Sequence, residues 1–156
     1  MEIHSGRLKE AISELVKRTG AKTVMLVSRE GYNVVEAGDV SYFNTIALAA
    51  LVAGTFSATR EMARMVGEKG FSILLQQGES RHIHISLIQD ALMLVIIFTD
   101  NDIIGRVRYE ARKTSFAIAE ILSEEANHED HNLRLQIPEF QDHALNLIDR
   151  VFEKKS

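Results

Sequence analysis

The chain has 156 residues, of which 46% are apolar and 26% charged, and these values are ordinary for a globular domain. It has no cysteine, which excludes disulfides and thiolate metal sites. The formal net charge of −4 gives no general attraction to nucleic acid or anionic lipid, so we expect neither as a partner.

The N-terminal stretch and the longest apolar run bear on location. The stretch MEIHSGRLKEAISELVKR is amphipathic and carries acidic residues, unlike a secretory signal peptide. The longest apolar run covers residues 91–98, whereas a helix needs about 20 apolar residues to span a bilayer. We therefore expect a soluble, cytoplasmic protein without membrane insertion.

The N-terminal region predicts a helix followed by a hairpin. Helical spacing of apolar residues begins after Ser5, which can cap the helix, and stops at Gly20. Residues 23–27 are apolar and mostly β-branched, which predicts a central strand covered on both faces. Residues 32–37 predict a second strand, and Gly31 supplies the corner because glycine tolerates a positive φ. The helically spaced residues are Leu8, Ala11, Ile12, Leu15 and Val16.

A long helix and three strands follow. Residues 42–66 have helical periodicity, and Gly67 ends the pattern. Residues 71–76, 81–88 and 91–98 predict strands joined by short turns. Short connections require antiparallel pairing, so we expect an antiparallel sheet.

The C-terminal third predicts two helices with a polar segment between them. Residues 103–122 place apolar side chains along one helical face. The acidic, polar segment 126–137 predicts a linker, and Pro138 opens an amphipathic helix over 138–156. The main domain is then 1–125, and its order α-β-β-α-β-β-β-α defines an α+β fold with helices packed on the faces of the sheet.

Sequence signatures of an enzyme are missing. G-x-x-x-x-G-K-[ST], G-x-G-x-x-G and G-x-S-x-G are all absent. Residues 100–110 partly imitate a calcium loop, but Ile104 and Ala111 stand where oxygen ligands are needed. We expect the acidic residues there to cap the next helix. The sequence therefore predicts no catalytic residue and no cofactor.

Two other clusters are candidates for a functional site. His82 and His84 share one face of a predicted strand, but no third metal ligand has diagnostic spacing, so we predict no metal and a solvated or interface strand face. The second cluster consists of Arg106, Arg108, Arg112 and Lys113, within two helical turns. A solvated helix face explains these basic residues, with contact to an acidic partner as the alternative.

The most informative segment is the helix over residues 46–63. Ala50, Gly54 and Ala58 are spaced four apart and form a smooth line down one face. Glycine inside a helix costs about 1 kcal/mol relative to alanine, and close approach of another helix is a usual compensation. We expect this line to lie at an interface. Four residues on the opposite side are expected to cover the sheet: Ile46, Ala53, Phe56 and Met62.

With these elements in place, the chain resembles the Roadblock family of dynein light-chain-like domains, from about Leu8 to Leu122. Three segments carry the resemblance: GAKTVMLVSREGYNVVEAGD, LAALVAGTFSATREMARMVGE and IIGRVRYEARKTSFAIAEIL. The polar segment and C-terminal helix are most similar to the MglB-like branch, bacterial regulators of a small Ras-like GTPase that sets cell polarity. These segments are patterns of packing and not catalytic signatures.

The resemblance implies the Roadblock/longin-like fold, a five-stranded antiparallel sheet with the alanine-rich helix on one face and the other two helices on the opposite face. It also implies a homodimer that pairs the alanine-rich helices and the strands 71–76. An edge strand this apolar invites aggregation unless it is paired. The predicted partner and dimer interface comprises Ala50, Ala53, Gly54, Ser57, Ala58, Glu61, Phe71, Ile73 and Leu75.

The resemblance further implies a GTPase activator without its own active site, acting on an MglA-type GTPase in cell polarity or motility. We expect the dimer to hold the switch loops of the GTPase in a catalytic arrangement, because no feature marks Arg60, Arg64 or Arg81 as an arginine finger. One alternative is a non-catalytic scaffold that tethers a GTPase or motor complex, and another is an enzyme with its own active site. The C-terminal helix is expected to dock on the GTPase or on the dimer.

Overall fold

The computed structural model describes residues 2–136. Its elements follow the predicted order and confirm the α+β class. The C-terminal helix predicted over 138–156 lies outside the described residues. The elements are α1 (Glu2–Thr19), β1 (Thr23–Ser28), β2 (Asn33–Gly38), α2 (Thr45–Val66), β3 (Ile73–Gln77), β4 (His82–Ile88), β5 (Leu92–Phe98), the 3-10 helix η1 (Asn101–Ile103) and α3 (Ile104–Gln136).

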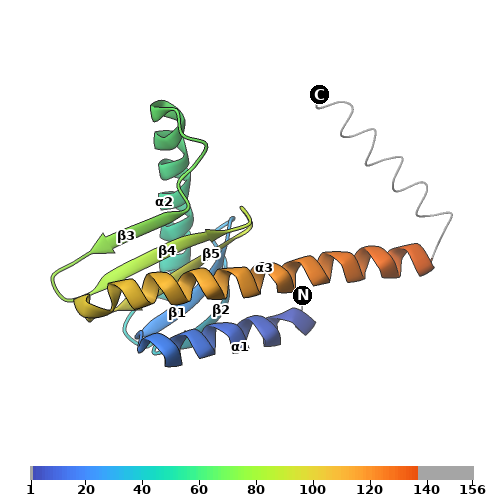
Figure 1. Cartoon of the computed structure of the whole chain (residues 1–156), viewed down its shortest axis with the longest axis horizontal. Coiled ribbons are helices and arrows are strands. Elements are labelled where there is room, and N and C mark those ends of the chain that lie inside the picture. Colours follow the sequence, from blue (N-terminus) through green and yellow to red (C-terminus); the bar gives the residue numbers. More distant parts are fainter. Residues whose placement is uncertain (1, 137–156) are drawn as a thin grey trace. The chain divides into compact units, whose positions relative to one another are not determined.

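The five strands form one antiparallel sheet in the order β2-β1-β5-β4-β3 (Figure 1). Two of the three inner strands, β1 and β5, are buried along almost their whole length, which explains their continuous apolar sequences. β4 and β5 are joined by a tight turn in which Gln89 and Asp90 both have positive φ. Two such residues define a type I′ turn, whose twist matches that of the paired strands.

Helices cover both faces of the sheet. The core on the α2 side consists of residues that alternate along the strands, such as Met25, Ile85 and Val95, and of Val52 and Phe56 from the helix. Figure 1 shows α1 and α3 side by side on the opposite face. An ion pair of 3.7 Å between Arg18 and Glu110 joins these two helices. This arrangement confirms the predicted layers.

The corner of the first hairpin has no ligand-gripping shape. Gly31 has a φ of +94°, and its N–H donates a 2.9 Å hydrogen bond to the carbonyl oxygen of Ser28. The turn is therefore a compact β1–β2 connection, which confirms the structural interpretation of this glycine.

Two helices begin at other residues than the sequence predicted. α1 begins at Glu2 and not after Ser5, because nothing between them interrupts a helix. α2 begins at Thr45 and not at Tyr42, because the side chain of Asn44 accepts a 3.1 Å hydrogen bond from the N–H of Ala47 and caps the first turn. Gly67, in the left-handed conformation, ends α2 as predicted.

The largest difference concerns α3, which was expected to end near Leu122 and continues to Gln136. The sequence has no glycine or proline between Gly105 and Pro138, and its polar strip is rich in residues compatible with a helix. Contacts group the described residues up to Ile121 into one compact unit, and the part of α3 from Leu122 onward lies outside that unit. The sheet, α1, α2 and the first half of α3 belong to the compact unit. The predicted division into a domain, a linker and a C-terminal helix stays a prediction.

Candidate interaction surface

α2 covers the sheet with one face only. Its buried residues are Ala49, Val52, Phe56 and Ala63, spaced three, four and seven apart, as expected for a single helical stripe. Phe56 is therefore confirmed as a core residue, and Ala53 is half-buried. Ile46 and Met62, also expected to cover the sheet, are wrong assignments, since both are largely exposed. Both residues lie outside the face of α2 that packs on the strands.

The opposite face of α2 is apolar and exposed. Between residues 45 and 59 the helix carries no charged side chain, yet Leu51 is 67% exposed and Met65, further along, is 86% exposed. A helix on the surface of a monomeric domain normally turns charged and polar residues to solvent. Contiguous exposed apolar surface of this kind marks an interaction site.

The structure places the small residues of α2 in two different environments. A β-carbon on Gly54 would meet no atom within 4 Å, and Ala58 beside it is exposed. Ala50 is also exposed, but it contacts the hairpin corner at Gly31, as the half-buried Ala53 does. The smooth line therefore has a partner within the chain at one end and open space at Gly54 and Ala58. The two other predicted interface residues of the helix, Ser57 and Glu61, are exposed.

The edge strand β3 is a second candidate interaction surface, besides the exposed face of α2. It pairs only with β4, so the hydrogen-bonding groups on its outer side have no strand beside them among the described residues. Ile73 is 45% exposed, and Leu75 is half-buried. Phe71 was predicted to be in the strand but precedes it, and it is 40% exposed. An apolar edge strand of this kind is a template for pairing with a second chain.

A hollow beside the first turns of α2 extends the exposed apolar surface. Its volume is about 390 Å³, and its lining includes Tyr42, Phe43, Leu51 and Arg81. The hydroxyls of Tyr42 and Thr23 lie 2.6 Å apart, which fixes the aromatic ring. Arg81 lies 4.8 Å above that ring. The sequence did not point to this hollow, because its lining comes from two loops, a helix and two strands.

His82 and His84 correct one prediction. They were expected on a solvated or interface strand face, but each is only 1% exposed. The prediction took the polar face of β4 as the outer one, but α3 covers the face that carries His84, and β4 has no exposed residue on either face. Among the described residues, no group of three or more side chains is arranged to hold a metal ion.

The calcium-like segment has the structural role that was predicted for its acids. The side chain of Asp100 caps η1 by accepting a 2.9 Å hydrogen bond from the N–H of Asp102.

In the basic cluster, Arg106, Arg108, Arg112 and Lys113 are all exposed. Among residues 2–136, no helix combines the length and apolar character that a membrane crossing requires.

A five-stranded antiparallel sheet with one helix on one face and two on the other is the architecture of a Roadblock-type domain. Residues 7–98 match the Roadblock/LC7 domain, and the chain belongs to this family. A comparison with curated protein sequences finds no match.

Solved structures of MglB are similar to this chain. Myxococcus xanthus MglB is 27% identical, with a TM-score of 0.74, and the match covers 77% of this chain and 90% of that one. The gliding protein MglB of Thermus thermophilus is 28% identical, with a TM-score of 0.71 and coverage of 77% and 91%. An MglB with a tetrameric arrangement is 26% identical, with a TM-score of 0.71 and coverage of 77% and 90%. The likeness indicates a Roadblock-domain regulator.

Proposed function

We propose that this chain is a homodimeric, cytoplasmic activator of a small Ras-like GTPase of the MglA type, working in cell polarity or motility. The observation that carries the proposal is the exposed apolar face of α2, whose residues 45–59 include no charged side chain, on a chain similar to MglB. One of the similar structures is named as a gliding protein, and another has a tetrameric arrangement, which supports both the cellular role and assembly.

In the proposed dimer, the exposed face of α2 and the edge of β3 both meet a second protomer. Gly54 and Ala58 allow two helix backbones to approach closely, since neither extends a bulky side chain. Pairing of β3 with its counterpart removes an open sheet edge. Dimerisation then buries apolar residues around these contacts, including Leu51 and Ile73, away from solvent. The proposed interface is the predicted set: Ala50, Ala53, Gly54, Ser57, Ala58, Glu61, Phe71, Ile73 and Leu75.

The proposed mechanism is reorganisation of the switch loops of the GTPase. A binding partner shifts a conformational equilibrium only by its differential affinity for the two states, so the dimer must bind the GTP-state loops more tightly. Three arginines that were candidates for direct insertion have partners within the chain. Arg60 pairs with Asp90 at 2.9 Å, Arg64 pairs with Glu61 at 3.3 Å, and Arg81 lies over the ring of Tyr42. An arginine finger would have to leave such a partner.

Single-turnover GTP hydrolysis tests the proposal. The MglA-type GTPase of the same organism is loaded with GTP, and the rate is measured with and without a saturating amount of this protein. We expect a faster rate with the protein present, and no GTP hydrolysis by the protein alone. Tight binding without any change in rate contradicts activation and favours the scaffold. Hydrolysis by the protein alone contradicts the absence of its own active site.

A further inference from the structure

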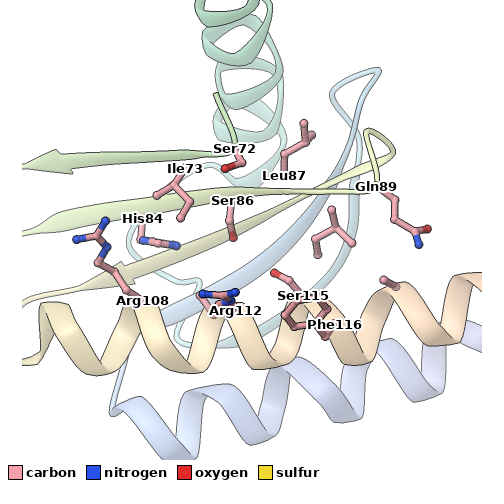
Figure 2. A pocket seen from close by; sticks show the side chains of 13 residues that line it. Ser72, Ile73, His84, Ser86, Leu87, Gln89, Arg108, Arg112, Ser115 and Phe116 are labelled. Carbon is pink, nitrogen blue, oxygen red and sulfur yellow. The ribbon is translucent and has the colours of Figure 1, made fainter. Parts of the chain in front are cut away.

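A cavity lies on the face of the sheet opposite α2. It has a volume of about 530 Å³ and is bounded by β3, β4 and the first half of α3. Figure 2 shows the side chains of His84 and Ser86 reaching into it from the sheet, and those of Arg112 and Ser115 reaching into it from α3. None of its lining residues belongs to α2, but Ile73 of the proposed β3 edge is one of them.

Several polar groups in this cavity lack a hydrogen-bond partner among residues 2–136. Both ring nitrogens of His84, and the hydroxyls of Ser86 and Ser115, make no hydrogen bond within the described part of the chain. His84 and Ser86 are 1% and 7% exposed. A buried polar group without a hydrogen bond costs about 1–3 kcal/mol, so such groups are normally satisfied. A bound molecule with polar atoms would satisfy these.

The electrostatics of the cavity favour an anion. Arg108 and Arg112 line it, no acidic residue does, and neither arginine forms an ion pair with a described residue. Burial and then the charge of Arg108 lower the pKa of His84 to about 4, so the imidazole is neutral near pH 7 and offers one N–H donor. Two guanidinium groups, an imidazole N–H and serine hydroxyls form a donor set suited to carboxylate or phosphate oxygens.

The remaining wall of the cavity is apolar. Its apolar residues are Ile73, Leu87, Ile88, Ala111, Phe116 and Ala119. Arg112 lies 5.9 Å from the ring of Phe116, which places a cation at the border between the polar and apolar parts. The volume falls in the range of about 300–1,000 Å³ that is typical of small-molecule pockets. We propose that this cavity binds a small organic anion, with its charged group at His84, Arg108 and Arg112 and its apolar body against Phe116 and Ile73.

The test uses the full chain with isotope-labelled histidine and three probes. The probe for the proposed ligand class is 1-naphthoate. Its neutral isostere 1-naphthalenemethanol tests the charge, and inorganic phosphate tests the anion without an apolar body. The imidazole resonances of His84 report occupancy of this cavity by NMR, so binding to the apolar face of α2 is not mistaken for it. We expect 1-naphthoate to shift these resonances, and each other probe to bind at least about tenfold more weakly.

Two arginine variants test whether 1-naphthoate binds in this cavity or elsewhere on α3. Arg112→Gln should weaken 1-naphthoate binding by about tenfold or more, because it removes a charge-assisted hydrogen bond. Arg106→Gln is the matched control, since Arg106 is exposed on the same helix and does not line the cavity, and it should leave the affinity unchanged. Unmoved His84 resonances, equal binding of the neutral alcohol or of inorganic phosphate, or full affinity in Arg112→Gln would each overturn the proposal. None of these readouts depends on the GTPase.

Discussion

Gly31, at the corner of the β1–β2 hairpin, lies directly against Ala50 of α2. A β-carbon on Gly31 would come within 3.3 Å of the α-carbon of Ala50 and within 3.5 Å of the β-carbon of Ala53. The hairpin corner and the helix therefore both need small residues at this contact. Part of the small-residue pattern of α2 serves the fold of the chain itself, and Gly54 and Ala58 remain as the part that this contact does not explain.

Gly31→Ala should destabilise the protein by about 1–3 kcal/mol. The φ of +94° disfavours any side chain, and the added methyl group would press on the backbone of Ala50, which cannot rotate away. The free energy of unfolding is measured by urea denaturation of the full chain. Gly6→Ala is the control, because a β-carbon on Gly6 in α1 meets open space, and it should be neutral or stabilising. Unchanged stability in Gly31→Ala would show that the corner is not held as described.

The fold was predictable from the sequence because its periodicities are strong. The apolar runs of β1 and β5, the helical stripe of α2 and the glycine corners each indicate one kind of structure. The end of α3 was missed because a polar segment gives no apolar period, and only the absence of glycine and proline argues for a helix. The capping role of Asn44 was missed for a local reason, since Ser41 is as good a candidate by residue type and Thr45 is only somewhat weaker.

The candidate site was predictable only in part. Alternation along β4 showed correctly that His84 and Ile85 lie on opposite faces, but both faces are buried, and sequence alone does not show which neighbours cover a strand. The line of Ala50, Gly54 and Ala58 predicted an interface face on α2, although Ile46 was assigned to the core and is exposed. The cavity beneath α3 joins residues from β3, β4 and α3, so no short segment carries its signature.

Gly54→Ala should have opposite effects on the protomer and on the dimer. The β-carbon meets nothing within 4 Å in its own chain, so the helix gains up to about 1 kcal/mol of intrinsic stability. The same methyl group would keep two α2 helices further apart and weaken association. Urea denaturation of dilute protein measures the first effect, and the dimer dissociation constant measures the second. If the dissociation constant is unchanged in Gly54→Ala, then Gly54 is not at the interface.

Replacing single arginines should have little effect on activation. Arg60→Ala, Arg64→Ala and Arg81→Ala should each lower the stimulated rate of GTP hydrolysis by less than about tenfold at saturating protein, since an arginine finger contributes about 10³–10⁵. Saturation matters because Arg60 and Arg64 lie on α2, where replacement can weaken binding. Single-turnover rates across a titration separate the two effects. A loss of about a thousandfold in one variant, with binding intact, would identify a finger and contradict the proposed mechanism.

The stability of the protein should fall between pH 6.5 and pH 4 in a manner that depends on His84. Its pKa is lowered from 6.5 to about 4 in the folded protein, chiefly by burial and then by Arg108, so the unfolded chain binds more protons in this window. The contribution to stability is complete above about pH 6.5 and is lost as the pH falls toward 4, by at most about 3 kcal/mol.

His84→Phe removes this titration while it keeps a ring in the same place. The charged groups that share the cavity, Arg108 and Arg112, and the buried His82 are present in both proteins. Urea denaturation at several pH values should therefore give a shallower pH dependence for the variant than for the wild type. Equal slopes would show that His84 is not shielded from solvent in the folded state.

Sedimentation velocity over a range of protein concentrations tests most directly whether the exposed face of α2 binds a second protomer. The wild type and Gly6→Arg, which places the same arginine on an open position of α1, should sediment as dimers. Gly54→Arg should sediment as a folded monomer, because a long charged side chain on the smooth face of α2 prevents close helix approach. A wild type that is monomeric at every concentration, or a Gly54→Arg variant that is as dimeric as the wild type, would contradict the account.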